Sequence, residues 1–310
     1  MSSKIINPIS DDISTIVEKI TRYSYNINCK LLPSFNYVNN STSAGKTVKD
    51  KFISYSGLFT SQPSSMREHN DEFVNDTQLS GDTRYNLYNR FRDCPEYGGK
   101  IRELARKEGC FYCHQNRGGD SFELDHYCDK KKYPYLQISP LNLLPVCKKC
   151  NGKKSAKDYK NYVNPFIDDI PQNLQFLEFK FIHPGNGQSW ESYEIKYSIQ
   201  KGTDSKFHSH FHELELGERF ALGIDTEFRN EIPSLLSCKS VEEFKILLKD
   251  IYNKSAQAGG IWGRNNYRIS MWIFFKNNPD CLWNYIEKYK SDLISYFSPF
   301  GNIPEDKILV

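Results

Sequence analysis

The first hundred residues carry apolar side chains at helical spacing. Ser10-Asp11-Asp12 supplies capping residues, and an apolar face with a three-to-four-residue period follows it. That face consists of Ile13, Ile16, Val17 and Ile20. A second helical pattern runs from Thr83 to Lys107, and Pro95 with Gly98-Gly99 divides it into two pieces. We therefore expect a mostly helical N-terminal region over residues 1–99.

The last part of the chain begins with a strand pattern and continues with helical patterns. Leu177–Phe181 alternates as a half-buried strand does, and Tyr193–Ile199 is its expected partner across a turn at Pro184–Gly187. From Glu215 onward the spacing is helical. The clearest example is the set Val241, Phe244, Leu247, Leu248 and Ile251. Residues 166–310 are therefore expected to form a mixed, helix-rich region.

Composition limits the class of protein. The 310 residues suffice for about two domains with a sizeable core. Mean hydropathy is −0.64, and the longest apolar run, Met271–Phe275, is far shorter than the roughly 18 residues of a membrane helix. No apolar signal segment opens the chain. We expect a cytoplasmic protein without a membrane segment, where thiols stay reduced and the nine cysteines raise the question of a metal.

Charge is distributed unevenly along the chain. The net charge is only +3, but Ile101–Lys160 contains thirteen Lys and Arg against seven Asp and Glu. The rest of the chain is therefore slightly acidic. A basic segment in an otherwise neutral protein is typical of phosphate binding.

Two cysteine pairs lie within the basic segment. Cys110-x-x-Cys113 and Cys147-x-x-Cys150 each place two thiols on one tight turn, and four thiolates match the tetrahedral preference of structural zinc. The alternatives are two unrelated buried pairs, or His114 in place of one cysteine ligand. The other cysteines, at positions 29, 94, 128, 238 and 281, are expected to be buried thiols.

Polar residues with catalytic chemistry lie between and just after the cysteine pairs. Asp125-His126 ends an apolar run, and a carboxylate beside an imidazole can hold a hard cation and activate water. Asn142 can fix a histidine tautomer, and Asn151 can offer an oxygen ligand. Nearby lysines suit a polyphosphate substrate. They include Lys130, Lys131, Lys132, Lys153 and Lys154. The set favours metal-assisted phosphodiester hydrolysis.

These motifs resemble the HNH nucleases, also called ββα-metal nucleases, in the branch held by four cysteines. The resemblance covers about residues 105–170. It implies a central ββα module over residues 100–165 in an α+β protein, with helix-rich regions on both sides. In that family an Asp-His pair ends the first strand, a central Asn precedes the second strand, and the last motif residue opens the helix. Asp125-His126, Asn142 and Asn151 occupy these positions.

The resemblance also implies roles for these residues. His126 would be the general base, and Asn142 would orient it. Asp125 and Asn151 would hold a catalytic ion. Lys154 would contact phosphate or have a structural role. The last motif position is commonly His, and an Asn there favours Mg²⁺ or Mn²⁺ over softer ions. Structural Zn²⁺ and catalytic Mg²⁺ or Mn²⁺ are the expected cofactors.

The expected activity is endonuclease cleavage of DNA, with RNA left open. The stretch around Asp125–Asn142 also looks like a subset of bacterial nucleases from anti-phage or mobile loci. The protein could therefore be a defence effector controlled by a partner, such as a regulatory ATPase or another subunit. The alternative is a non-catalytic zinc-ribbon module that binds nucleic acid or protein and keeps a vestigial site.

Two other patterns favour structural roles. His208, His210 and His212 would share one face of a strand, where an exposed polar face is favoured over a metal site because no carboxylate or Cys pattern accompanies them. Aromatic residues near the C-terminus lie at loosely helical spacing, which favours core packing over base stacking. They are Trp262, Tyr267, Trp272 and Trp283.

Overall fold

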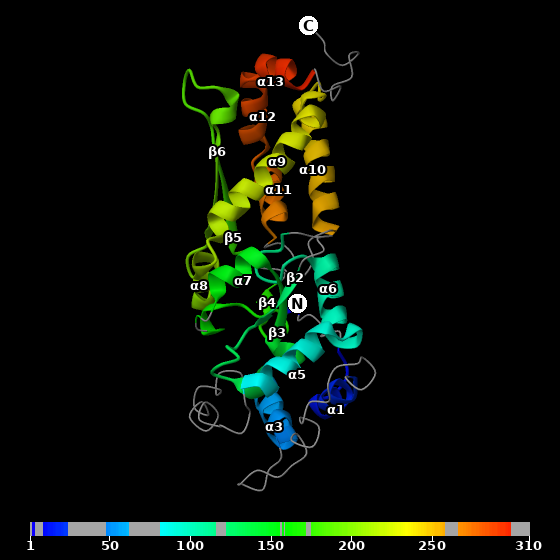
Figure 1. The fold of residues 1–310 in the computed structure, drawn as a ribbon. Helices are drawn as coiled ribbons and strands as arrows, with labels where there is room; N and C mark the ends of the chain where they lie inside the picture. The colour runs from blue at the N-terminus through cyan, green and yellow to red at the C-terminus, as the bar shows by residue number, and fades with distance from the viewer. Residues whose placement is uncertain are drawn as a thin grey trace. The chain divides into compact units, whose positions relative to one another are not determined.

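The protein folds as two compact units in a computed structural model (Figure 1). The structure describes residues 2–3, 9–23, 48–61, 81–115, 122–155, 157, 159–171, 175–257 and 266–298. One unit is Lys4–Asp169, and the other joins Met1–Ser3 to Ile170–Val310. The division into regions 1–99, 100–165 and 166–310 stays a prediction.

Helices precede the first cysteine pair in the Lys4–Asp169 unit. They are α1 (Ile13–Tyr23), α3 (Val48–Ser61), α5 (Gly81–Asp93) and α6 (Lys100–Glu108). The predicted cap of α1 is confirmed, because the Thr15 backbone N–H donates to Asp12 Oδ1 at 2.7 Å. Ile16 and Ile20 on its apolar face are fully buried.

The break between α5 and α6 lies where the sequence predicts it. A π-helical turn, η2 (Pro95–Gly99), separates the two helices. Only glycine fits at position 98, since a Cβ atom there would lie 2.2 Å from the carbonyl oxygen of Arg92. The Arg102 guanidinium donates to the same carbonyl at 2.8 Å. The turn thus fixes the direction of α6 relative to α5.

The segment that carries the candidate residues folds as a strand hairpin followed by a helix. β2 (Phe122–His126) pairs antiparallel with β3 (Leu143–Cys147) and places Asp125 opposite Leu144. Helix α7 (Lys148–Lys154) follows directly. Both α6 and α7 pack against the two strands (Figure 1). The last residues of β2 and the first turn of α7 can therefore form one site.

The loop between β2 and β3 is packed into the unit. It contains the short 3₁₀ turns η3 (Pro134–Leu136) and η4 (Pro140–Asn142). The buried Tyr127 hydroxyl donates to the carbonyl of Tyr162 at 2.9 Å. The buried ring of Tyr135 stacks on Tyr55 of α3 with centroids 5.4 Å apart. A loop anchored in this way can hold neighbouring side chains in fixed positions. A further 3₁₀ turn, η5 (Tyr159–Asn161), follows α7.

The second unit combines small sheets with helices. The predicted strand pair is confirmed: β5 (Leu177–Ile182) pairs antiparallel with β6 (Glu194–Ile199). Before it, β1 (Ser2–Ser3) pairs with β4 (Ile170–Pro171). Between β5 and β6 lies the turn η6 (Trp190–Ser192).

Helices follow this strand pair, as the sequence predicts for the chain beyond Glu215. They are α8 (Ser205–Glu213), α9 (Leu216–Leu236), α10 (Val241–Gln257), α11 (Tyr267–Asn277), α12 (Pro279–Lys288) and α13 (Lys290–Phe297). Helix α9 packs on β6 and α11 on β5 (Figure 1). At the centre of the core, Phe181 contacts the rings of Phe228, Phe275 and Tyr285.

The three histidines do not lie on a strand, so they cannot share a strand face. His208, His210 and His212 lie on helix α8, which Asp204 caps by accepting from the Lys206 backbone N–H at 2.7 Å. Helical spacing separates them: His210 is buried, His208 half-buried and His212 exposed. They therefore do not form one exposed polar face.

Core packing is the role of the described C-terminal aromatics. Tyr267 and Trp272 are buried, and Trp283 packs edge-on against Phe244 with centroids 5.2 Å apart. Trp262 lies outside the described residues. The prediction of a mixed helix and sheet protein with a four-cysteine cluster is confirmed. Among the described helices, none has the length and apolar character to cross a membrane.

Candidate metal centre and active site

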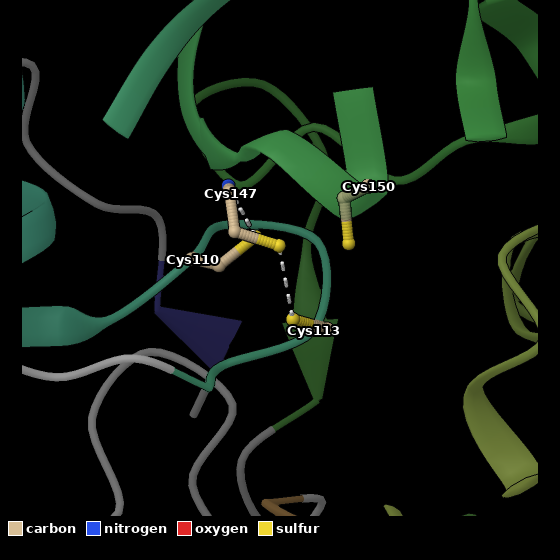
Figure 2. A group of neighbouring side chains, drawn as sticks. All are labelled: Cys110, Cys113, Cys147 and Cys150. Atoms are coloured by element: carbon tan, nitrogen blue, oxygen red, sulfur yellow. Dashed lines mark hydrogen bonds between the residues drawn. The ribbon is translucent and has the colours of Figure 1, made fainter. Parts of the chain in front are cut away.

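The two cysteine pairs meet in one buried cluster. Figure 2 shows Cys110 and Cys113 on the turn after α6, Cys147 at the end of β3 and Cys150 on α7. Their four sulfur atoms lie within 4.8 Å of one another. Cys113 Sγ is 3.9 Å from Cys147 Sγ, and the Cys147 backbone N–H donates to Cys110 Sγ at 3.2 Å. The hypothesis of two unrelated pairs is therefore wrong, and His114 is not part of the cluster.

The chemistry of this cluster fits a soft cation. Burial raises the pKa of the Cys110 thiol, so thiolates packed this closely require a positive charge between them. Four sulfur donors without a water position suit a closed structural zinc site. Gly109 makes the turn possible, because its φ of 85° is a conformation that side chains disfavour. The cluster joins α6, β3 and α7.

A pocket of about 550 Å³ lies beside the hairpin, on the same unit. Its walls include Asp125, His126 and Asn151, three of the residues that the sequence predicts for the catalytic site. Tyr88 of α5 and Glu123 of β2 also line it. Fold and register thus bring the end of β2 and the first turn of α7 to one concave surface, where a ligand can contact both.

Asp125 is a buried carboxylate with two donors. Tyr112 Oη donates to its Oδ2 at 2.8 Å, and Lys154 Nζ lies 3.0 Å from the same oxygen. Burial raises the pKa of Asp125, and the Lys154 charge opposes that shift. Both donors use Oδ2, so the two partners that fix the side chain leave the Oδ1 lone pairs for a cation.

His126 is held as a neutral ring. Its Nε2 lies 3.1 Å from the carbonyl oxygen of Gln137, and since a carbonyl only accepts, Nε2 carries the proton. Nδ1 is then the nitrogen that can accept another proton. The Tyr88 ring packs against the imidazole with centroids 4.6 Å apart. Burial, with a smaller contribution from Lys130, lowers the pKa of His126 to about 3, so the ring is the neutral imidazole at neutral pH.

Asn142 holds the loop, and its side chain bonds to loop backbone rather than to the His126 ring. Its Oδ1 accepts from the Cys128 N–H at 2.7 Å, and its Nδ2 donates to the carbonyls of Cys128 and Leu136 at 3.3 and 3.0 Å. The residue after Leu136 is Gln137, whose carbonyl fixes the His126 ring. Asn142 can therefore orient His126 only indirectly, through this loop.

We expect Asn142→Ala to loosen the loop. The change removes the acceptor of the buried Cys128 amide, which costs about 1–3 kcal/mol, whereas the Leu136 carbonyl keeps the Ser139 N–H as a donor. Hydrogen exchange of peptides covering residues 128–137 would rise. Asn142→Asp keeps an acceptor for the Cys128 N–H, so its exchange rate should lie between those of the wild type and Asn142→Ala. Unchanged exchange in Asn142→Ala would contradict this role.

Asn151 pairs with a carboxylate that the sequence does not single out. Its Nδ2 donates to Glu123 Oε2 at 2.6 Å. Asn151 is half-buried and Glu123 exposed, and both line the pocket. The amide oxygen of Asn151 is thereby left for another partner.

The candidate phosphate-binding lysines differ in exposure. Lys130, Lys131 and Lys132 are exposed, and Lys130 Nζ lies 5.1 Å from the centre of the Tyr88 ring at the pocket. Lys153 is half-buried. Lys154 is buried, with its Nζ donating to the His126 carbonyl at 2.8 Å. This burial favours the structural alternative for Lys154 and removes it from the surface that nucleic acid could reach.

Sequence reasoning missed Tyr88, Tyr112 and Glu123. Tyr88 lies far from the hairpin in sequence, yet its hydroxyl donates to the Leu124 carbonyl at 2.9 Å. No local pattern predicts that contact. Glu123 had a usable signal, since residues two apart on a strand point to the same face, which places it beside Asp125.

Comparison with known proteins gives a distant and partial similarity. The chain is 35% identical over 74 residues to the Septu protein PtuB of Bacillus thuringiensis. The aligned stretch is 23% of this chain and 29% of that relative, so less than a third of either protein is matched. No protein-family model matches the chain, and no solved structure matches it at a significant level.

Proposed function

We propose that this protein is a metal-dependent endonuclease of the HNH type that hydrolyses phosphodiester bonds in DNA. The observation that carries the proposal is the pocket shared by Asp125, His126 and Asn151, next to a hairpin and helix that the four-cysteine cluster joins. An imidazole and oxygen donors at one concave surface are the groups that hydrolysis of a phosphodiester needs.

The donor set fits a hard divalent cation. The Asp125 carboxylate and the Asn151 amide both offer oxygen, the ligand type that Mg²⁺ and Mn²⁺ prefer. Such an ion, when bound, would neutralise charge on the scissile phosphate. The Tyr112 and Lys154 contacts keep the Asp125 side chain in place for this role.

His126 is the proposed general base. A water molecule attacks the phosphorus atom and transfers its proton to Nδ1, while the bond from phosphorus to the leaving oxygen breaks. The Gln137 carbonyl and the Tyr88 ring hold the imidazole in one orientation and in the tautomer that leaves Nδ1 unprotonated. An anionic phosphate next to the ring raises its pKa, so the ring becomes a better proton acceptor when substrate is bound.

Exposed lysines supply the proposed phosphate contacts. Lys130, Lys131 and Lys132 lie in the loop that follows β2, and Lys130 is part of the pocket wall. Contacts of this kind position a nucleic acid without reading its sequence. Specificity would then depend on other surfaces or on a partner.

We further propose that the nuclease serves a bacterial defence system under the control of a partner subunit, such as an ATPase. The resemblance to nucleases of anti-phage loci and the distant similarity to the Septu protein PtuB support this assignment. The mass of the assembly that co-purifies with the chain, measured from its native host, would identify such a partner.

Cleavage of supercoiled plasmid with Mg²⁺ or Mn²⁺ tests the nuclease. His126→Ala is expected to lower the rate by roughly a hundredfold or more, because general-base catalysis typically contributes at least that much. His212→Ala, an exposed histidine on α8, is the matched control and should cleave as the wild type does. The non-catalytic zinc-ribbon interpretation replaces the nuclease proposal if the wild-type protein binds zinc and DNA but does not cleave DNA, either alone or in its native assembly.

A further inference from the structure

We propose that Glu123 is a positioning residue that orients the Asn151 amide for metal binding. The inference rests on the proposed nuclease function and assigns a role to a residue that the motif does not single out. Glu123 would act through Asn151 and not as a ligand itself.

The contact between the two side chains can have only one polarity. A carboxylate accepts hydrogen bonds and cannot donate them. The 2.6 Å approach of Glu123 Oε2 to the Asn151 amide therefore requires the NH₂ group on the Glu123 side. The charge on the acceptor also makes this hydrogen bond stronger than one between neutral groups.

The orientation matters because an amide has two unlike ends. The NH₂ and C=O ends of asparagine have nearly the same size, but only the oxygen can bind a cation. A rotation of the amide by about half a turn would aim its hydrogens at the ion. Glu123 opposes that rotation, since the amide oxygen of Asn151 would then face the carboxylate oxygen of Glu123. Ligands of metal ions are commonly held by outer partners in this way.

Strand geometry brings the positioning residue next to the metal site. Glu123 and Asp125 are two residues apart on β2, so their side chains leave the same face of the strand. Both line the pocket together with Asn151. One strand face therefore presents a buried carboxylate that can bind the ion and an exposed carboxylate that holds the second ligand.

Mn²⁺ binding to the zinc-loaded full-length protein tests this role apart from activity. The free ion is measured by its electron paramagnetic resonance signal, without DNA. Glu123→Ala is expected to weaken Mn²⁺ binding about 10–100-fold, the usual effect of losing an outer-shell partner. Glu123→Gln keeps an acceptor oxygen for Asn151 but loses the charge, so its affinity should stay within about threefold of wild type, as a lost exposed charge is worth little.

A second substitution gives a rescue that a general structural role would not produce. Aspartate at position 151 has two oxygen atoms, so either orientation presents a ligand. Asn151→Asp added to Glu123→Ala should restore Mn²⁺ affinity, whereas Asn151→Ala added to Glu123→Ala should be no weaker than Asn151→Ala alone. Zinc content and the thermal unfolding temperature identify any variant that has lost its fold.

The outcomes separate this inference from the proposed function. If Asp125→Ala abolishes Mn²⁺ binding while Glu123→Ala binds as wild type does, Glu123 has no positioning role and the nuclease proposal stands. If Glu123→Gln is as weak as Glu123→Ala, the carboxylate charge acts on the ion and the positioning role is overturned. If the wild-type protein does not bind Mn²⁺ at all, both proposals fail.

Discussion

Replacing Cys110 by alanine is expected to abolish zinc binding at the four-cysteine cluster and to unfold the β2–β3 hairpin. The four sulfur atoms join α6, β3 and α7, and the strands between them are only five residues each. Structural zinc contributes on the order of 10 kcal/mol to the folding of small zinc domains, as much as a typical domain's whole stability. Loss of one ligand should therefore unfold the hairpin.

Zinc content and hydrogen exchange of β2 and β3 check this expectation. Cys128→Ala is the matched control, because Cys128 is also fully buried in the same unit but lies outside the cluster. It should keep its zinc and its protection. Chelation of the wild-type protein should reproduce the effect of Cys110→Ala. Retention of zinc by Cys110→Ala, with protected strands, would show that the cluster is not the metal site.

Local patterns predicted much of the fold. The cap at Asp12, the break at Pro95–Gly99 and the pair β5–β6 follow from residues close together in sequence, whose side chains decide the backbone conformation. Cysteine spacing also predicted the cluster, since each Cys-x-x-Cys pair holds two metal-ligating sulfur atoms close together in sequence. The alternating residues His208–His212 form a helix, because alternation of polar residues over a short run does not distinguish a strand from a capped helix.

Contacts between segments that are distant in sequence could not be predicted from sequence patterns. Tyr88 reaches the pocket from α5 because that helix packs near β2, and no periodicity encodes this approach. The burial of Lys154 depends likewise on how α7 packs on the strands, and lysine is rarely so buried. The sequence thus identified the residues that have catalytic chemistry, while the residues that support them required the three-dimensional packing.

Substituting methionine for Lys154 is expected to destabilise the hairpin by about 3–5 kcal/mol, the usual cost of removing one member of a buried ion pair. Lys154 is only 1% exposed, and its Nζ contacts Asp125 Oδ2 at 3.0 Å and the His126 carbonyl at 2.8 Å. Methionine fills similar volume but leaves the Asp125 charge buried with the Tyr112 hydroxyl as its remaining donor. Lysine at this position therefore offsets a charge that the proposed metal site needs.

Native-state hydrogen exchange of the β2 amides measures this cost as an opening free energy. Lys149→Met, an exposed lysine on the same helix, is the control and should change that free energy by less than about 0.5 kcal/mol. Because the penalty arises from the unpaired carboxylate, Asp125→Asn added to Lys154→Met should recover part of it, and the two substitutions should not be additive. A cost near zero for Lys154→Met would mean that water solvates Asp125. The buried pair would then have no part in holding the site together.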